Sequence, residues 1–160
     1  MKNDVLRILR KNARESIDNI ADRIGSDPET VKKIVDELER DKIVIGYQAV
    51  VDESLLPESQ VKAIIEVHIQ PQREGGFDNI ARRLANFSEV NSLYLVSGGY
   101  DLQLEVQGES LQEVAGFVSQ KLATIEGVTS TATHFLLKKY KEAGRIFEDG
   151  AEYERLKITP

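Results

Sequence analysis

Two adjacent lysines, Lys32 and Lys33, stand close to Thr30 in a segment with the spacing of an amphipathic helix. Ammonium groups on an exposed helix face can bind DNA phosphates or base edges, and a threonine hydroxyl can add a hydrogen bond beside them. The same residues also suit a helix face that contacts only water, so both interpretations stand at this stage. Further cations that could flank the same groove occur earlier, at Arg10, Lys11 and Arg14.

A second group with chemical potential is the run Ser97-Gly98-Gly99-Tyr100-Asp101. The paired glycines allow backbone conformations that a side chain would block, so that backbone N–H groups can converge on a ligand. A zwitterionic amino acid could then bind with its amine on Asp101 and its carboxylate on the loop amides. The alternative is a tight β-turn in which the Asp101 carboxylate satisfies the turn itself.

The remaining sequence offers little catalytic or metal-binding chemistry. Cysteine is absent, and the two histidines, His68 and His134, have no partners at the spacing of zinc ligands. The sequence contains no phosphate loop, nucleophile elbow or dinucleotide fingerprint. We therefore expect no metal, no cofactor and no enzymatic activity, and we interpret His134 as a hydrogen-bonded histidine at an interface.

Charge is distributed unevenly along the 160 residues, whose net charge is −6. Residues 1–52 hold 10 Lys and Arg against 11 Asp and Glu, net −1, whereas residues 53–160 hold 11 against 16, net −5. An acidic surface repels phosphate, so any DNA contact is expected in the first part. Without cysteine, a secretory signal or an apolar run of roughly 20 residues, the composition favours a cytoplasmic protein that does not bind membranes.

Three short helices are expected in the first part to position the lysines. The apolar residues follow helical spacing, and Ser16 and Gly25 are well placed to begin and end the second helix. Ser26 and Glu29 fit a capping box that begins the third. Two helices that meet at Gly25 predict a helix–turn–helix, a unit that places its second helix in the DNA major groove. The apolar stripes of these two helices consist of Ile17, Ile20, Ala21 and Ile24, followed by Val31, Ile34, Val35 and Leu38.

The later part alternates between strand and helix patterns in the order β-α-β-β-α-β. This order predicts a split βαβ, ferredoxin-like domain of the α+β class, with both helices on one face of an antiparallel sheet. The open face would then invite a partner sheet. Tyr47–Val51 is strand-like, residues 71–76 suggest a turn, and residues 156–158 could add an edge strand. We expect a helix–turn–helix domain over 1–46, a linker over 47–60, the ferredoxin-like domain over 61–141 and a tail over 142–160.

Three features together resemble the Lrp/AsnC family of feast/famine transcriptional regulators. They are the trihelical N-terminus, the sequence Ile-Gly-Tyr-Gln-Ala-Val-Val-Asp at residues 45–52, and a βαββαβ domain that carries Val-Ser-Gly-Gly-Tyr-Asp at residues 96–101. The resemblance implies a winged helix–turn–helix that binds double-stranded DNA, joined to a domain that senses an amino acid or related metabolite. It also implies homodimers, which commonly assemble into octamers.

The resemblance also implies roles for individual residues. The third helix becomes the recognition helix, whose outward residues include Glu29, Thr30, Lys32 and Lys33. Because Asp36, Glu37 and Glu39 follow these lysines, one copy is expected to bind DNA weakly, and several copies in an oligomer would compensate. The effector pocket implied by the resemblance consists of Ser97, Gly98, Gly99, Tyr100 and Asp101 together with Thr131 and Thr133.

Two other functions remain open for a chain of this build. Some proteins with the same two domains are siroheme decarboxylases, which use His and Arg to bind an anionic tetrapyrrole. The second domain here is acidic and has only two histidines, which suits such a substrate poorly. The third possibility is a ligand-sensing oligomer that does not bind DNA.

Overall fold

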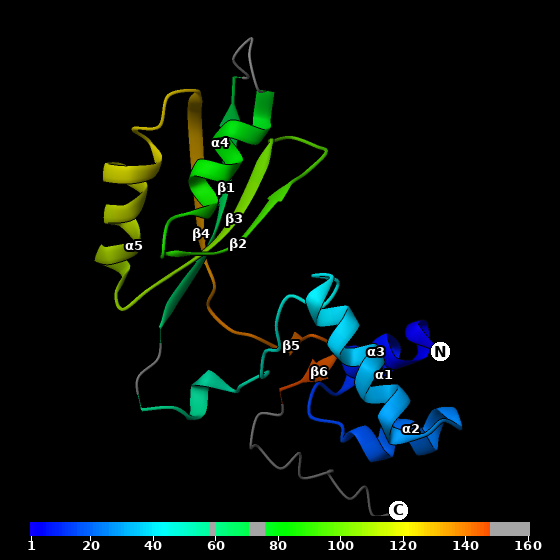
Figure 1. Ribbon diagram of the computed structural model, residues 1–160. Coiled ribbons are helices and arrows are strands. Elements are labelled where there is room, and N and C mark those ends of the chain that lie inside the picture. Colours follow the sequence, from blue (N-terminus) through cyan, green and yellow to red (C-terminus); the bar gives the residue numbers. More distant parts are fainter. Residues whose placement is uncertain (58–59, 71–75, 148–160) are drawn as a thin grey trace, which may run out of the picture. The chain divides into compact units, whose positions relative to one another are not determined.

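The computed structural model describes residues 1–57, 60–70 and 76–147 (Figure 1). The chain divides into two compact units, Met1–Val50 and Val51–Pro160. Each unit has its own apolar core, and the two cores share no residue. Among the described residues, no helix is both long and apolar enough to cross a bilayer.

The N-terminal unit consists of three helices, α1 (Lys2–Lys11), α2 (Ile17–Ile24) and α3 (Pro28–Arg40). Each helix directs one apolar stripe toward a common centre, as the helical spacing predicts. An ion pair of 2.6 Å between Lys2 Nζ and Glu37 Oε2 links α1 to α3 at the surface. The buried residues at the centre are Val5, Ile20, Ala21, Val31, Ile34 and Leu38.

The turn between α2 and α3 has the expected left-handed glycine but a different cap. Ser16 Oγ accepts a hydrogen bond from Asn19 N at 3.1 Å, and Gly25 ends α2 with φ 64°. The predicted capping box of Ser26 and Glu29 is wrong, because Asp27 is the N-cap of α3 and accepts from the backbone N–H of Thr30. Pro28 explains the difference, since proline favours the first helical position and disfavours helical geometry in the residue before it.

Replacing Gly25 by Ala is expected to lower the free energy of unfolding of the N-terminal unit by about 1 kcal/mol, the usual cost of left-handed backbone for an L residue. A Cβ at Gly25 would meet no atom within 4 Å, so the cost is one of backbone conformation alone. Lys42, which follows α3, is a non-glycine residue in the left-handed region, with φ 58°, so here a change to glycine should relieve the cost. Lys42→Gly should raise stability. Hydrogen exchange of α2 and α3 amides measures both effects, and changes of the same sign would contradict this explanation.

The segment after α3 contains no strand among residues 41–57, so the predicted strand Tyr47–Val51 is absent from the single chain. Tyr47 Oη instead donates to Glu39 Oε1 at 2.8 Å. Ile45 is 88% exposed, and Val51 is exposed as well. A strand needs a neighbour to pair its backbone, and no other part of the described chain supplies one here.

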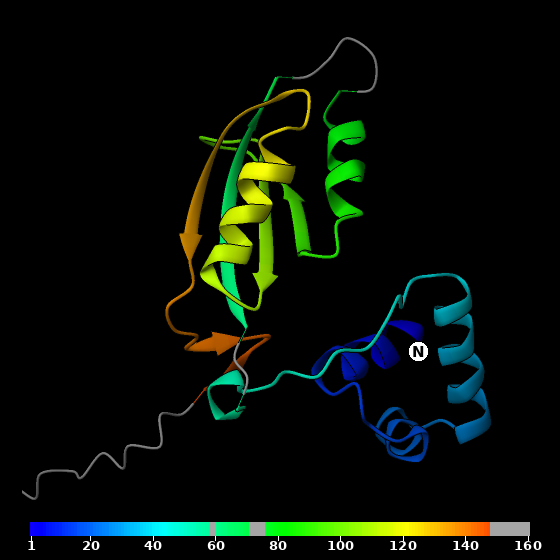
Figure 2. The same ribbon diagram turned by 90° about the vertical axis from the view of Figure 1, so that its left-hand side faces the viewer.

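The C-terminal unit has the predicted βαββαβ order. The sheet has the order β2-β3-β1-β4 and is antiparallel throughout. Figure 2 shows α4 and α5 on the same face of this sheet. The elements are β1 (Val61–Ile69), α4 (Gly76–Ala85), β2 (Val90–Leu95), β3 (Leu102–Gly108), α5 (Leu111–Phe117) with a π-helical turn (Val118–Leu122), and β4 (Val128–Phe135).

The two faces of the sheet differ sharply in polarity. Alternate residues of β1 and β3, including Ile65, Val67 and Leu104, are fully buried beneath the helices. Their neighbours on the other face are half-buried polar or apolar side chains, which leaves that face uncovered in the single chain. The residues of β1 and β3 on this open face are Lys62, Ile64, Glu66, His68, Gln103, Glu105 and Gln107.

A short hairpin follows the sheet and was not foreseen from the sequence. Its strands are β5 (Lys141–Glu142) and β6 (Arg145–Ile146), joined by a two-residue turn. Before β1, a single 3-10 turn, η1 (Glu53–Leu55), leads from the linker into the domain. Gly76, which the sequence placed in a turn, is the first residue of α4, while residues 71–75 and 156–158 lie outside the described residues.

Candidate DNA interface and ligand site

The two lysines of α3 are exposed, and each is paired within its own helix. Lys32 Nζ lies 3.2 Å from Asp36 Oδ2, and Lys33 Nζ lies 2.8 Å from Glu29 Oε1. Pairs of this i, i+4 type on an exposed helix contribute only about 0.3–0.5 kcal/mol each. A phosphate can therefore displace the carboxylate from either lysine at small cost.

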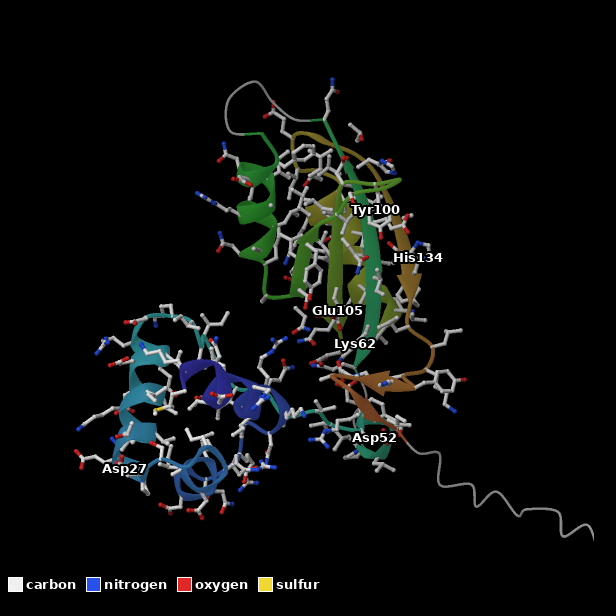
Figure 3. All side chains as sticks on the ribbon, turned by 90° about the vertical axis from the view of Figure 1, so that its right-hand side faces the viewer. Asp27, Asp52, Lys62, Tyr100, Glu105 and His134 are labelled. Carbon is white, nitrogen blue, oxygen red and sulfur yellow. The ribbon has the colours of Figure 1, made fainter. Side chains whose placement is uncertain are left out.

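The first turn of α3 is held by Asp27, which is labelled in Figure 3. Asp27 Oδ1 accepts from Thr30 N at 2.8 Å, and hydrogen bonding from Thr30 keeps the pKa of the Asp27 carboxyl below its usual range. The ionised cap therefore stabilises the helix at neutral pH, and this stabilisation is lost as the pH falls through the lowered pKa. Both the half-buried side chain and the backbone N–H of Thr30 contribute to the lowered pKa of Asp27.

The other predicted DNA contacts come from a different element. Arg10 and Lys11 occupy the last turn of α1, and Arg14 follows the helix. All three are exposed, and the backbone N–H of Arg14 donates to Asn12 Oδ1 at 3.1 Å. Lys2, at the start of α1, forms the ion pair with Glu37 of α3, and Arg10 lies about 12 Å farther along α1. These cations and the α3 lysines therefore form two groups on separate helices.

The loop Ser97–Asp101 connects β2 to β3, and Asp101 has a structural role in it. Asp101 Oδ2 accepts from the backbone N–H of Ile69 at 2.8 Å, and Asp101 N donates to Val67 O at 3.1 Å. The carboxylate thus binds the end of β1 just where β1 runs out of partners on β3. The sequence left open whether Asp101 binds a ligand or stabilises its own turn. The carboxylate does have a structural role, but it accepts from the backbone of the neighbouring strand β1 instead of from the turn itself.

The two glycines of the same loop have open space beside their backbone. Gly98 has φ 151°, and a Cβ at Gly98 or Gly99 would meet no atom within 4 Å. Tyr100 is held by a hydrogen bond of 2.9 Å from its hydroxyl to Gln103 Oε1. Asp101 Oδ1 makes no hydrogen bond within the described part of the chain, so this carboxylate oxygen remains available in the loop that contains the two glycines.

Thr131 and Thr133 lie on β4, opposite Val67 and Ile65 of β1, and both are half-buried. Asp101 reaches the same Val67 from the other side of β1. The backbones of Thr131 and Asp101 are therefore two strand spacings apart, about 10 Å. Thr131 thus pairs with the same β1 residue that the loop binds, Val67, whereas Thr133 lies two residues farther along β4.

One polar cluster of the C-terminal unit was missed by the sequence reasoning. Lys62 Nζ lies 2.6 Å from Glu53 Oε1, and Lys139 Nζ lies 3.9 Å from Glu53 Oε2 and 2.6 Å from Glu142 Oε2. Its members come from two separate stretches of sequence, residues 53–62 and 139–142, so no local pattern indicates the whole cluster. The described residues contain no group of three or more His, Cys, Asp or Glu side chains able to hold a metal ion.

Comparison with known families accounts for both units. The family described as "Winged helix-turn-helix DNA-binding" matches residues 2–45, and the "Lrp/AsnC ligand binding domain" matches residues 62–146. The chain belongs to the Lrp/AsnC family. It is a DNA-binding transcriptional regulator with a ligand-binding domain, as the sequence predicted.

Individual Lrp/AsnC relatives match over nearly the whole chain. The uncharacterised HTH-type transcriptional regulator YugG of Bacillus subtilis is 43% identical, over 98% of this chain and 95% of its own. LrpA of Pyrococcus horikoshii is 31% identical, over 86% and 94%. Both are described as HTH-type transcriptional regulators.

Solved structures share the fold of this chain at lower identity. MtbAldR is 20% identical with a TM-score of 0.75, covering 88% of this chain and 94% of its own. A transcriptional regulator from Neisseria meningitidis, solved as a complex with L-Met, is 23% identical with a TM-score of 0.70, covering 88% and 90%.

Proposed function

We propose that this regulator senses a free amino acid or a closely related metabolite at the loop Ser97–Asp101. The observation that carries the proposal is the divided role of Asp101. One carboxylate oxygen binds Ile69 N, and the other has no partner among the described residues, in a loop that also holds two unobstructed glycines. The open oxygen would accept from the ligand's ammonium group, and the loop amides would donate to its carboxylate. Thr131 would add a hydroxyl from β4, and Thr133 would border the site.

The L-Met bound by the Neisseria relative supports an amino acid as the class of ligand. A ligand can alter DNA binding only through a difference in affinity between two states of the protein. We propose that these states differ in how copies of the chain assemble, which changes the spacing of their DNA-binding units. No catalytic step is part of this function.

A homodimer, with further assembly to an octamer, is proposed as the unit that binds DNA. Its support is the surface that one chain leaves uncovered, which consists of the open sheet face and the apolar segment from Ile45 to Val51. This segment has the side chains of a strand but lacks a partner, which a second copy could supply. Each dimer would present two α3 helices, and linking them raises the effective concentration of the second.

The DNA contacts proposed for each copy come from both basic groups. Lys32 and Lys33 would bind phosphates or base edges after releasing their carboxylate partners, with Thr30 and Glu29 beside them on the first turns of α3. The contacts from α1 and the residues after it would be to phosphates, from Arg10, Lys11 and Arg14.

The ligand site is tested by Asp101→Asn, measured by calorimetry across the amino acids. Asparagine keeps a carbonyl oxygen for Ile69 N–H but loses the charge that would bind the ammonium group. We expect at least about tenfold weaker ligand binding with an unchanged fold, since charge-assisted hydrogen bonds contribute roughly 1.5–3 kcal/mol. Asp101→Ala is the less specific variant, because it also removes the acceptor at the end of β1.

The matched control is Asp78→Asn, which removes one exposed charge from the first turn of α4. It should leave ligand affinity unchanged. Unchanged affinity in Asp101→Asn, for a ligand that the unmodified protein binds, would refute the assignment of the ammonium group to Asp101.

A further inference from the structure

The segment of chain that joins the two units is short and is not held by bonds of its own. Residues 48–51 make no hydrogen bond to any other described residue. Val50 and Val51 are exposed, so apolar packing does not hold the segment either. Its freedom therefore depends on what holds the chain on either side of it. Two polar contacts do so, and each lies within a single unit.

The first contact holds the linker to α3 within the N-terminal unit. The chain leaves α3 through Val44, whose side chain packs on the helical core. Ile45 is exposed, and the next attachment is the hydrogen bond of 2.8 Å from Tyr47 Oη to Glu39 Oε1. Partial burial raises the pKa of Tyr47, and the Glu39 carboxylate raises it further. The hydroxyl therefore stays protonated at neutral pH and remains a donor.

The second contact holds the other end of the linker to the sheet within the C-terminal unit. Glu53 begins the turn η1, and its carboxylate oxygens lie 2.6 Å from Lys62 Nζ and 3.9 Å from Lys139 Nζ. Lys62 belongs to β1 and is labelled in Figure 3. Leu55 of the same turn is 81% exposed, and Leu56 after it is exposed as well. Apolar packing therefore does not hold the turn, and Glu53 attaches it to the sheet.

The contact between Glu53 and Lys62 differs from the exposed ion pairs of α3. The Lys62 side chain is only 13% exposed, and a charge with so little access to water is costly unless it is paired. Lys139 has a second carboxylate partner, Glu142 Oε2 at 2.6 Å. Lys62 has Glu53 alone among the described residues. The ammonium group of Lys62 therefore favours the state in which the turn stays on the sheet.

Only five residues, 48–52, lie between these two contacts. If the Tyr47 contact were lost, the free chain would extend back to Val44 and would have eight residues. If the Glu53 contact were lost, it would extend to the start of β1 at Val61 and would have 13 residues. The two side chains thus decide how much free chain separates α3 from the sheet.

We propose that Tyr47 and Glu53 are positioning residues that keep the free chain between the two units short. They limit the arrangements open to α3 once copies of the chain assemble, so the inference rests on the assembled regulator proposed above. A ligand-dependent change in assembly then reaches α3 through five residues instead of a long tether.

The size of the effect follows from chain length. Effective concentration falls roughly as the −3/2 power of the length of a flexible linker. A free chain of 13 residues instead of five therefore lowers the effective concentration of the second α3 helix about fourfold, and one of eight residues about twofold.

Distances between labels in the two units test the contacts directly. The chain contains no cysteine, so spin labels on D22C in α2 and R83C in α4 mark one exposed position in each unit. Dilution with unlabelled copies keeps each measured distance within one chain. The distance distribution should broaden in Y47F and should broaden further in E53Q.

The matched control is E89Q. Glu89 also pairs with a lysine of the C-terminal unit, Lys121, but neither residue belongs to the linker or to η1. Its distance distribution should equal that of the unmodified protein. E53Q/K62M is a second variant that breaks the same contact without leaving the Lys62 charge unpaired, and it should broaden the distribution as E53Q does. Hydrogen exchange of β1 amides shows whether the sheet stays folded in both.

Anisotropy with DNA of the protein's own upstream region measures the functional effect. Affinity should fall about fourfold in E53Q and about twofold in Y47F. The slope of log affinity against log salt should stay unchanged, because no phosphate contact is lost.

The proposal is overturned by any of three results. They are a distribution in the unmodified protein as broad as in E53Q, equal broadening in E89Q, and broadening without loss of DNA affinity. An unmodified protein that sediments as a monomer would instead refute the proposed assembly, and the distances would still test both contacts.

Discussion

Leu104→Ala is expected to lower the free energy of unfolding of the C-terminal unit by about 2–5 kcal/mol, the range for large-to-small changes in a packed core. Leu104 is 0% exposed and sits in the middle of β3, between Ile65 on β1 and Leu93 on β2. Truncation leaves a cavity that three strands and the covering helices cannot close without moving together. Most of the cost therefore persists after relaxation.

The matched control is Leu137→Ala, because Leu137 is 95% exposed and should change stability by less than about 0.5 kcal/mol. Both variants are compared at one protein concentration, since association alters apparent stability. Hydrogen exchange of β3 and α3 amides measures the stability of each unit separately. Because the two cores share no residue, α3 protection should stay unchanged in Leu104→Ala. A loss below about 1 kcal/mol would contradict the central position of β3.

Local periodicity explains why so much of the fold was predictable. The alternation in Val61–Ile69 reports burial of every second residue, and the structure buries those residues. Gly25 likewise indicated a left-handed turn through a property of glycine itself. Such patterns involve only residues that are close in sequence, so they predict a strand or a turn without knowledge of tertiary contacts.

The errors arise where a structure depends on distant or absent partners. Asp101 binds the backbone of Ile69 from 32 positions away, which no local pattern reveals. Tyr47–Val51 has strand composition, but a strand also requires a neighbouring backbone. The cluster of Glu53, Lys62 and Lys139 joins η1 and β1 to the segment between β4 and β5. The loop Ser97–Asp101 was therefore predicted from sequence as a break between two strands, while the role of the Asp101 carboxylate in the fold was not.

The double variant K32Q/K33Q is expected to weaken DNA binding, because it removes two cations from α3. If each lysine makes one phosphate contact, the slope of log affinity against log salt falls by about 1.8 per copy. Taking equal affinities at 1 M salt, this corresponds to roughly 60-fold weaker binding at 0.1 M salt. A mobility shift on the protein's own upstream region, followed by anisotropy, measures both quantities.

The opposite change gives the prediction its control. E29Q/D36N removes the carboxylates that pair with Lys33 and Lys32, so the lysines lose their competing partners while the apolar face of α3 is untouched. DNA affinity should rise, because two negative charges near the phosphates are also removed. Equal, weak effects of both variants would mean that α3 does not approach DNA through this face. If K32Q/K33Q weakens DNA binding and E29Q/D36N strengthens it, both in a folded protein, the acidic residues of α3 lower the affinity of this helix for DNA. Tight binding then depends on assembly of several copies and on phosphate contacts outside α3.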